Sequence, residues 1–198
     1  GVLWFKFVPD NPKQSPYVNE AELEHINDGR ENTVEAKEIA PWGKLLKSSQ
    51  FWSLGLQFMI TDYIMYVFLA WLPLYLMEVH GFSLSKMGLW AAAPWLSLMA
   101  VVSCCGYLSD KAIAAGFSQN LVKTSTGAVG ILLCACTLFI ATRTADPMMN
   151  VFWLSVALGS LGLTMSASWS SVISMGGRFA GSVSGWMNFW GNIGGVLA

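Results

Sequence analysis

The residue with the clearest chemical potential is Asp62, because it is the only charged residue in the long apolar stretch 51–77. An acid near the middle of a membrane-spanning helix costs roughly 2.5–3.5 kcal/mol on insertion scales, so it normally faces protein or a water-filled cavity. Ionisable side chains at membrane depth are functional candidates for this reason. A carboxylate at this depth could carry a proton, bind a ligand, or pair structurally with an Arg elsewhere.

Polar neighbours on the same stretch extend this candidate site. Tyr66 follows Asp62 by one helical turn, and Gln57 and Thr61 share a neighbouring stripe of the same helix. A phenol beside a carboxylate can donate or accept a hydrogen bond to a polar ligand. The spacing therefore predicts a proton-carrying or ligand-binding carboxylate next to Tyr66.

A second group of candidates lies near the end of the chain. Small residues and two amides fall at steps of four, three, four and three, which places on one helical face Gly181, Gly185, Asn188, Asn192 and Gly195. Gly191 and Gly195 also form a small-xxx-small pair, which favours close packing between membrane helices. The amides have two interpretations, because they can hydrogen-bond between helices or line a polar pathway.

The apolar stretch before them carries hydroxyls at helical spacing, at Ser160, Thr164, Ser168 and Ser171. Hydroxyls on membrane helices often bond to carbonyls of their own helix, so a structural role is expected for them. Trp169 lies in the same stretch, away from either membrane interface, where indoles are usually enriched. It is therefore a candidate for contact with a ligand.

Composition narrows the class of protein. The 198 residues are 54% hydrophobic and 12% charged, whereas a soluble domain is about 25% charged. The net charge of −1, without any basic stripe, argues against nucleic-acid binding. Both histidines, His25 and His80, lie in polar segments, so no catalytic cluster is expected at membrane depth.

The cysteines do not indicate a metal site. They occur only in apolar runs, at Cys104, Cys105, Cys134 and Cys136. Without a nearby His, their spacing is a poor match to zinc ligands. We expect buried thiols, no disulfide, no metal and no cofactor.

These residues must be positioned by an all-α, polytopic membrane bundle. We expect residues 1–8 to end one membrane helix and residues 9–50 to form a polar linker with a surface helix over 15–27. A bundle of five helices follows over 51–198, at about 51–77, 87–108, 124–142, 148–175 and 179–198. Each is long enough to cross a hydrocarbon core of about 30 Å. The apolar run at each end of the chain indicates an internal segment of a longer protein.

Basic residues predict the orientation. If the helices alternate, one side of the membrane holds only Lys86 and Arg143. The other nine of the eleven basic residues lie on the opposite side, namely Lys6, Lys13, Arg30, Lys37, Lys44, Lys47, Lys111, Lys123 and Arg178. Because cytoplasmic loops carry an excess of Lys and Arg, residues 9–50 are predicted to be cytoplasmic.

The turn after the second complete span carries a recognisable motif, G-Y-L-S-D-K at residues 106–111. It resembles the cytoplasmic loop signature of major facilitator superfamily transporters. The resemblance implies that Gly106, Asp110 and Lys111 belong to a gating loop that latches the two halves of the carrier. In physical terms, a Gly allows close helix approach and an Asp can cap a helix start.

Further segments resemble the anion:cation symporter family within that superfamily. They are Y-V-N-E-A-E-L-E-H-I at 17–26, Y-V-F-L-A-W-L-P-L-Y-L at 66–76, G-F-S at 81–83 with K-M-G at 86–88, and A-G-S-V-S-G-W-M-N at 180–188. They occur in the family's order over nearly the whole chain. By this resemblance the chain runs from the end of helix six through the middle loop to helix eleven. It would form a truncated carboxyl-terminal half.

The resemblance implies secondary transport of a small organic anion, such as a sugar acid or another carboxylate, by alternating access. The expected partners are the carboxylate, a proton (sodium being the alternative ion), the lipid bilayer and the amino-terminal half of the same transporter. Expected substrate contacts are Asp62, Tyr66, Gln57, Trp169 and Asn188, with Asp62 also the proton-coupling candidate. No catalytic residue is expected, and the multi-pass protein is expected in the cell (inner or plasma) membrane.

The sequence is also compatible with two other functions. A proton-coupled carrier of sugars or drugs would share the 106–111 motif but should lack the other matches. A receptor with a carrier-like body is a further alternative. No Lys or Arg is expected inside a span, so the cation that neutralises an anionic substrate is expected in the amino-terminal half.

Overall fold

The computed structural model describes residue 9, residues 12–27 and residues 40–198, with the side chains of 12 and 25–27 excepted. Two compact units divide the chain, residues 1–39 and residues 40–198. In the first unit, a 3₁₀ turn at Pro12–Gln14 precedes helix α2, Glu20–Asn27. Asn19 caps α2, because its Oδ1 accepts a hydrogen bond from the backbone N–H of Glu22 at 2.8 Å. The helix therefore begins later than residue 15. Residues 1–8, predicted as a helix end, lie outside the described part.

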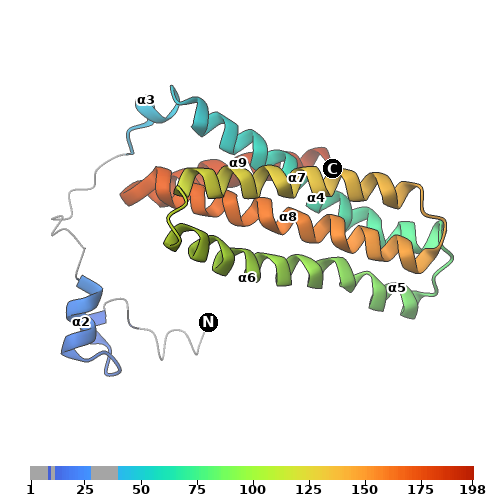
Figure 1. Cartoon of the computed structure of the whole chain (residues 1–198), viewed down its shortest axis with the longest axis horizontal. Coiled ribbons are helices and arrows are strands. Elements are labelled where there is room, and N and C mark those ends of the chain that lie inside the picture. The colour runs from blue at the N-terminus through green and yellow to red at the C-terminus, as the bar shows by residue number, and fades with distance from the viewer. Residues whose placement is uncertain (1–8, 10–11, 28–39) are drawn as a thin grey trace. The chain divides into compact units, whose positions relative to one another are not determined.

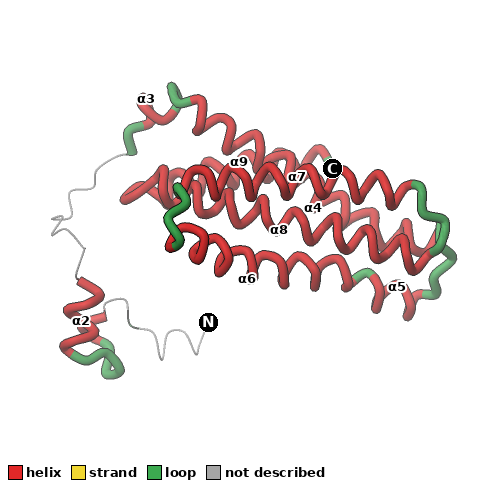
Figure 2. Tube along the Cα trace, viewed as in Figure 1, coloured by secondary structure: helices red, strands yellow, loops and turns green. Residues whose placement is uncertain are grey.

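The second unit is built from helices, as Figure 2 shows, and no described residue lies in a strand. This confirms the predicted all-α membrane bundle. Its helices are α3 (Trp42–Leu45), α4 (Ser49–Glu78), α5 (Leu84–Trp90), α6 (Ala92–Ala114), α7 (Gln119–Thr142), α8 (Pro147–Gly176) and α9 (Ala180–Leu197).

Four helical segments of this unit are long and apolar enough to cross a membrane: Ser49–Glu78, Leu84–Ala114, Gln119–Thr142 and Pro147–Leu197. The last has 51 residues, which as one straight helix would be about 76 Å long, over twice a hydrocarbon core. It contains both α8 and α9, and the chain reverses between them (Figure 1). The reversal uses Gly177, whose φ of 47° lies in a region that other residues rarely adopt.

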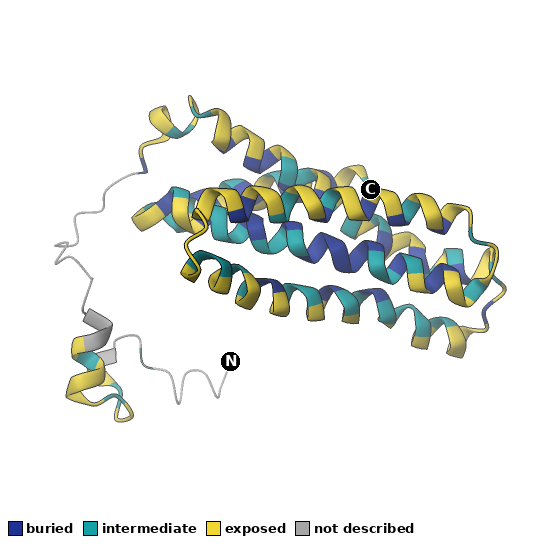
Figure 3. Cartoon of the chain, in the orientation of Figure 1, coloured by how far each residue is buried: buried dark blue, intermediate teal, exposed yellow. Residues whose placement is uncertain are grey.

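Helix α8 is the centre of the bundle. About 56% of its most apolar window is buried, against 17–28% for the other three segments. Figure 3 shows its buried middle, where Ala157, Leu158 and Leu161 have no exposed surface. Helices α6 and α7 pack along α8, whereas α4 packs mainly against α9. The unit therefore consists of a group α6–α7–α8 and a pair α4–α9, which we call the three-helix group and the two-helix pair.

Small residues allow the three-helix group to pack closely. A Cβ added at Gly162 of α8 would lie 3.1 Å from the Leu98 carbonyl oxygen of α6. One added at Gly130 of α7 would lie 2.7 Å from the Ser160 carbonyl oxygen of α8. Membrane helices associate by close packing of this kind, because lipid supplies no hydrophobic drive between them.

A buried amide joins the two groups at the end of the bundle where α4 ends and α8 begins. Asn150, fully buried in α8, donates from Nδ2 to the Tyr75 hydroxyl of α4 at 3.1 Å and to the Ala141 carbonyl of α7 at 2.8 Å. His80 Nε2 lies 3.2 Å from the same hydroxyl, so His80 is a half-buried partner and not the solvated turn residue that its polar segment indicated.

The four cysteines are free thiols. Cys105 and Cys134 are buried, as expected from their apolar runs. Cys104 and Cys136 are exposed on the outside of the described bundle. In a membrane helix an apolar environment does not require burial in protein, because lipid provides it as well.

Candidate functional site

Asp62 lies on α4 at its contact with α9, not on the outer surface of the two-helix pair. The side chain is half-buried, and its carboxylate sits over Gly191, where any added Cβ would collide with Asp62 Oδ2. The same Cβ would lie 3.0 Å from two ring carbons of Phe58. The carboxylate and the Phe58 ring thus occupy the space that a side chain at residue 191 would fill.

Within the described part of the chain, no Lys or Arg forms an ion pair with Asp62, and no donor hydrogen-bonds to its carboxylate. A charged group taken out of water without a partner is strongly disfavoured. The arrangement therefore fits a carboxylate that takes up a proton or a ligand. A fixed structural pair would require a partner outside the described residues.

Trp169 reaches this seam through Phe58. The two rings meet edge to face, with centroids 6.1 Å apart and planes at 84°. Trp169 is half-buried on α8, so it is one ring away from the groups that surround Asp62. Of the predicted site residues on the three-helix group, it is the one that the structure brings toward the carboxylate.

Tyr66 and Asn188 lie on the exposed side of the same seam. The Tyr66 ring packs over Gly195, where an added Cβ would be 2.7 Å from Cε2, and the side chain is 39% exposed. Asn188 is exposed on α9, one turn before Gly191, and its Nδ2 donates to the Ser184 carbonyl at 3.0 Å. Asn192 bonds in the same way to the Asn188 carbonyl at 2.8 Å. Neither amide bonds another described helix, so both remain available on that face.

Gln57 lies on a different side of α4. Five residues separate it from Asp62, which corresponds to about 140° around a helix. Its Nε2 donates to Ser168 Oγ of α8 at 3.0 Å, and Ser168 donates in turn to the Thr164 carbonyl at 2.8 Å. Thr61, fully buried, bonds the Gln57 carbonyl at 3.0 Å. The structure thus places Gln57 in the joint between α4 and α8, apart from Asp62.

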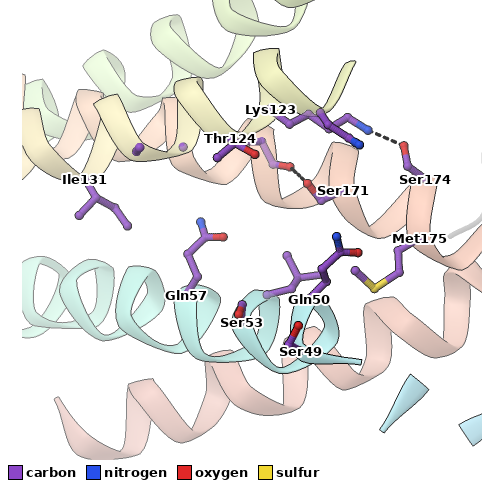
Figure 4. Close-up of a pocket in the computed structure, with 15 residues that line it drawn as sticks. Ser49, Gln50, Ser53, Gln57, Lys123, Thr124, Ile131, Ser171, Ser174 and Met175 are labelled. Atoms are coloured by element: carbon purple, nitrogen blue, oxygen red, sulfur yellow. Dashed lines mark hydrogen bonds between the residues drawn. The ribbon is translucent and has the colours of Figure 1, made fainter. Parts of the chain in front are cut away.

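A cavity of about 680 Å³ opens on this other side, between the first half of α4, the first half of α7 and the last turns of α8 (Figure 4). Gln57 lies on its wall, and so does Lys123. Lys123 is only 9% exposed, and its Nζ donates to the Ser170 carbonyl at 3.0 Å and to Ser174 Oγ.

The sequence prediction missed this buried cation because its helices at 87–108 and 124–142 left Lys123 in the connection between them. Helix α7 begins at Gln119, four residues before Lys123. The available signal was Ser118, whose hydroxyl accepts from the Leu121 N–H at 3.2 Å and caps the helix. Lys123 thus lies in the first turns of the apolar helical segment Gln119–Thr142 and not in a connection between helices.

Comparison with known proteins identifies the family of this chain. A family model described as Major Facilitator Superfamily matches residues 1–198, the whole chain. The chain belongs to the major facilitator superfamily. That family consists of multi-pass membrane transporters rather than enzymes.

Relatives of this major facilitator chain are named as anion transporters. It is 30% identical over 200 residues to a probable sulfoacetate transporter of Cupriavidus necator, covering 100% of this chain and 46% of that protein. It is 28% identical over 196 residues to a chloroplastic ascorbate transporter of Arabidopsis thaliana (99% and 36%). It is 27% identical over 206 residues to a D-galactonate transporter of Escherichia coli (98% and 47%). The chain thus spans between a third and a half of the length of these relatives.

The major facilitator motif at residues 106–111 lies on a helix and not in a loop. Helix α6 continues to Ala114, and Asp110 and Lys111 are exposed on its last turns. Asp110 therefore caps no helix start, and Lys111 Nζ lies 4.6 Å from the centroid of the Tyr107 ring. A Cβ added at Gly106 would meet nothing within 4 Å in the described chain. These residues face outward from the described bundle, on a surface open to other parts of the protein.

Proposed function

We propose that the protein carrying this chain is a secondary transporter that moves a small organic anion by alternating access and is coupled to protons. Two considerations support the anion. The relatives are named for ascorbate, sulfoacetate and D-galactonate, all of which carry negative charge at neutral pH. Major facilitator halves enclose their substrate near the membrane midplane, where α4 and α9 hold the candidate residues.

The observation that carries the proposal is the position of the Asp62 carboxylate, over Gly191, in the seam between α4 and α9. Because this half-buried acid has no cation among the described residues, its charge is best relieved by a proton during part of the cycle. We assign proton coupling to Asp62. Release of the proton on one side of the membrane and rebinding on the other would link substrate movement to the proton gradient.

Substrate contacts are assigned to the groups on the open side of the seam. Asn188 offers an amide to hydroxyl or carboxylate oxygens, Tyr66 offers a phenol, and Trp169 offers an apolar ring for packing. Gln57 is assigned to holding α4 against α8, because its amide already bonds Ser168. The cation that neutralises the substrate is expected from the amino-terminal half, since Lys123 lies on the other side of α4.

The remaining assignments concern the rest of the transporter. The exposed turns that carry Gly106, Asp110 and Lys111 would meet the amino-terminal half and steady one state of the cycle. The excess of basic residues supports a cytoplasmic location for the 9–50 linker, and the cell membrane is the proposed location of the protein.

The decisive experiment compares two transport modes of the full-length protein in proteoliposomes. Net uptake of labelled D-galactonate is driven by an inward proton gradient, and substrate exchange is measured without any gradient. Asp62→Asn keeps the size of the side chain but removes its titration. It should abolish net uptake and leave exchange largely intact.

A matched control is Glu78→Gln, which removes an exposed acid at the end of the same helix. It should alter neither mode. Undiminished net uptake by Asp62→Asn would remove coupling through this residue. Uptake that follows a sodium gradient would assign sodium as the ion. Preference for neutral galactose over galactonate would favour the sugar-carrier alternative.

A further inference from the structure

A chain of hydrogen bonds runs through the end of the bundle where α4 ends and α8 begins. Its buried centre is the Asn150 amide of α8, whose Nδ2 donates to the Ala141 carbonyl of α7 at 2.8 Å and to the Tyr75 hydroxyl of α4 at 3.1 Å. His80, in the turn after α4, places its Nε2 atom 3.2 Å from the same hydroxyl. The chain thus joins the two-helix pair to the three-helix group and ends at a histidine.

The direction of each bond follows from the neighbouring groups. Asn150 Nδ2 faces the carbonyl oxygens of Ala141 and Thr144, the latter at 3.4 Å, and a carbonyl can only accept. The Tyr75 oxygen therefore accepts from Nδ2, and its own O–H is left to donate. His80 Nε2 is the acceptor that the described residues place within hydrogen-bond distance of this O–H. An imidazole nitrogen accepts only without a proton, so the network assigns His80 as neutral, with its proton on Nδ1.

A proton on Nε2 would break this pattern. Imidazolium has two donors and no acceptor, so the Tyr75 oxygen would face donors on both sides and its O–H would lose its acceptor. A half-buried O–H without an acceptor is costly. The new charge would also lie near another cation, because the buried Phe82 ring has its centroid 6.4 Å from that of His80 and 4.3 Å from Lys86 Nζ. Both effects weaken the joint in acid.

The acidic residues at this end of the bundle do not offset that charge. Within the described part of the chain, none forms an ion pair with His80. Glu78, on the last turn of α4, is exposed, and exposed ion pairs contribute little. The carboxylate of Asp146 already caps the first turn of α8. Arg143, just after α7, adds a further positive charge.

We propose that His80 is a pH-sensitive latch between α4 and α8. As a neutral imidazole it accepts from Tyr75 and completes the chain to Asn150, and protonation releases the joint. Histidine is the side chain whose charge changes between about pH 5 and pH 8, so the latch is closed above this range and is lost as the pH falls through it. Release frees this end of the two-helix pair from the three-helix group. The latch is separate from Asp62 and does not depend on the transport assignment.

The test measures the separation of the two helix ends by electron paramagnetic resonance. Nitroxide labels are attached at the exposed residues Val79 and Met149, in full-length protein without its native cysteines, reconstituted in liposomes. Dipolar broadening should be strong at about pH 8 and reversibly weaker at about pH 5. The released fraction should rise about five- to tenfold, as expected for loss of one hydrogen bond.

Three variants isolate the histidine. His80→Gln keeps an acceptor for Tyr75 but cannot titrate, so the broadening should stay strong at both pH values. Tyr75→Phe removes the hydroxyl and should give weak broadening at both. His25→Gln removes the other histidine of the chain and should respond to pH like the unmodified protein.

The tautomer provides an independent measurement. In ¹⁵N spectra of histidine-labelled full-length protein, the signal that His80→Gln removes belongs to His80. At about pH 8 it should show an unprotonated Nε2, and in Tyr75→Phe this preference should be lost. If His80→Gln fails to fold, the response of Tyr75→Phe to pH decides the matter.

Three results would overturn the proposal. One is broadening that does not change with pH in the unmodified protein, as when a further segment of that protein holds the joint closed. Another is a pH response that persists undiminished in His80→Gln or in Tyr75→Phe. The third is a proton on Nε2 of His80 at about pH 8, because Tyr75 would then have no acceptor in the histidine.

Discussion

The contact between the Asp62 carboxylate and Gly191 can be tested directly by substitution. Gly191→Ala adds a methyl group that would collide with Asp62 Oδ2 and lie 3.0 Å from two ring carbons of Phe58. Overpacking of this kind costs about 1–3 kcal/mol, and replacing Gly by Ala in a helix returns about 1 kcal/mol. We therefore expect a net loss of up to about 2 kcal/mol in stability. Net transport should fall as well, because the carboxylate has to turn away.

A double-mutant cycle isolates the contact between the two residues. In an Asp62→Ala background the collision with Oδ2 is absent, so Gly191→Ala should cost about 1 kcal/mol less than it does beside Asp62. The measurement is thermal unfolding of the full-length protein in detergent. Because the relatives are more than twice as long as this chain, each kcal/mol is expected to shift the midpoint of the full-length protein by about 1 °C.

Gly88→Ala serves as the matched control. Gly88 is a helical glycine of α5 whose added Cβ would meet nothing within 4 Å in the described chain. It should be neutral or slightly stabilising. If Gly191→Ala behaves like Gly88→Ala in both stability and uptake, the carboxylate does not sit on Gly191, and the reasoning about the seam fails.

Two further predictions concern the joints between the helix groups. Asn150→Leu removes the bonds to Tyr75 and Ala141 and should lower stability by about 1–3 kcal/mol in thermal unfolding, whereas Ser155→Ala, whose hydroxyl bonds only its own helix, should change it little. A small effect of Asn150→Leu would show that the amide does not tie the helices. Gln57→Leu should lower stability by about 0.5–1.5 kcal/mol and leave the proton dependence of uptake unchanged, and an altered proton dependence would place Gln57 in the coupling site.

The sequence was sufficient for the class of fold and for the importance of Asp62, since both follow from the cost of polar groups in hydrocarbon. That cost does not determine where a helix ends at the membrane surface. Asp110 and Lys111 are tolerated equally well in a loop or on exposed helical turns, so the continuation of α6 to Ala114 could not be read from them.

Contacts between residues far apart in the sequence were the second feature that the sequence could not predict. Lys123 bonds Ser170 and Ser174, which lie about fifty residues further along the chain. No local sequence pattern predicts that contact. The separation of Gln57 from Asp62 is different. Helical spacing already placed them on different stripes, but only the packing of α9 and α8 showed which stripe meets which helix.

The division of the bundle into a three-helix group and a two-helix pair has a mechanical consequence. Few described side-chain bonds cross between them, chiefly Gln57 to Ser168 near one end and Asn150 to Tyr75 at the other. Asp62 and Gly191 lie within the pair, so sliding of one group past the other would carry both residues together and preserve their contact. The cavity lined by Gln57 and Lys123 has walls from both groups, so the same sliding would change its width.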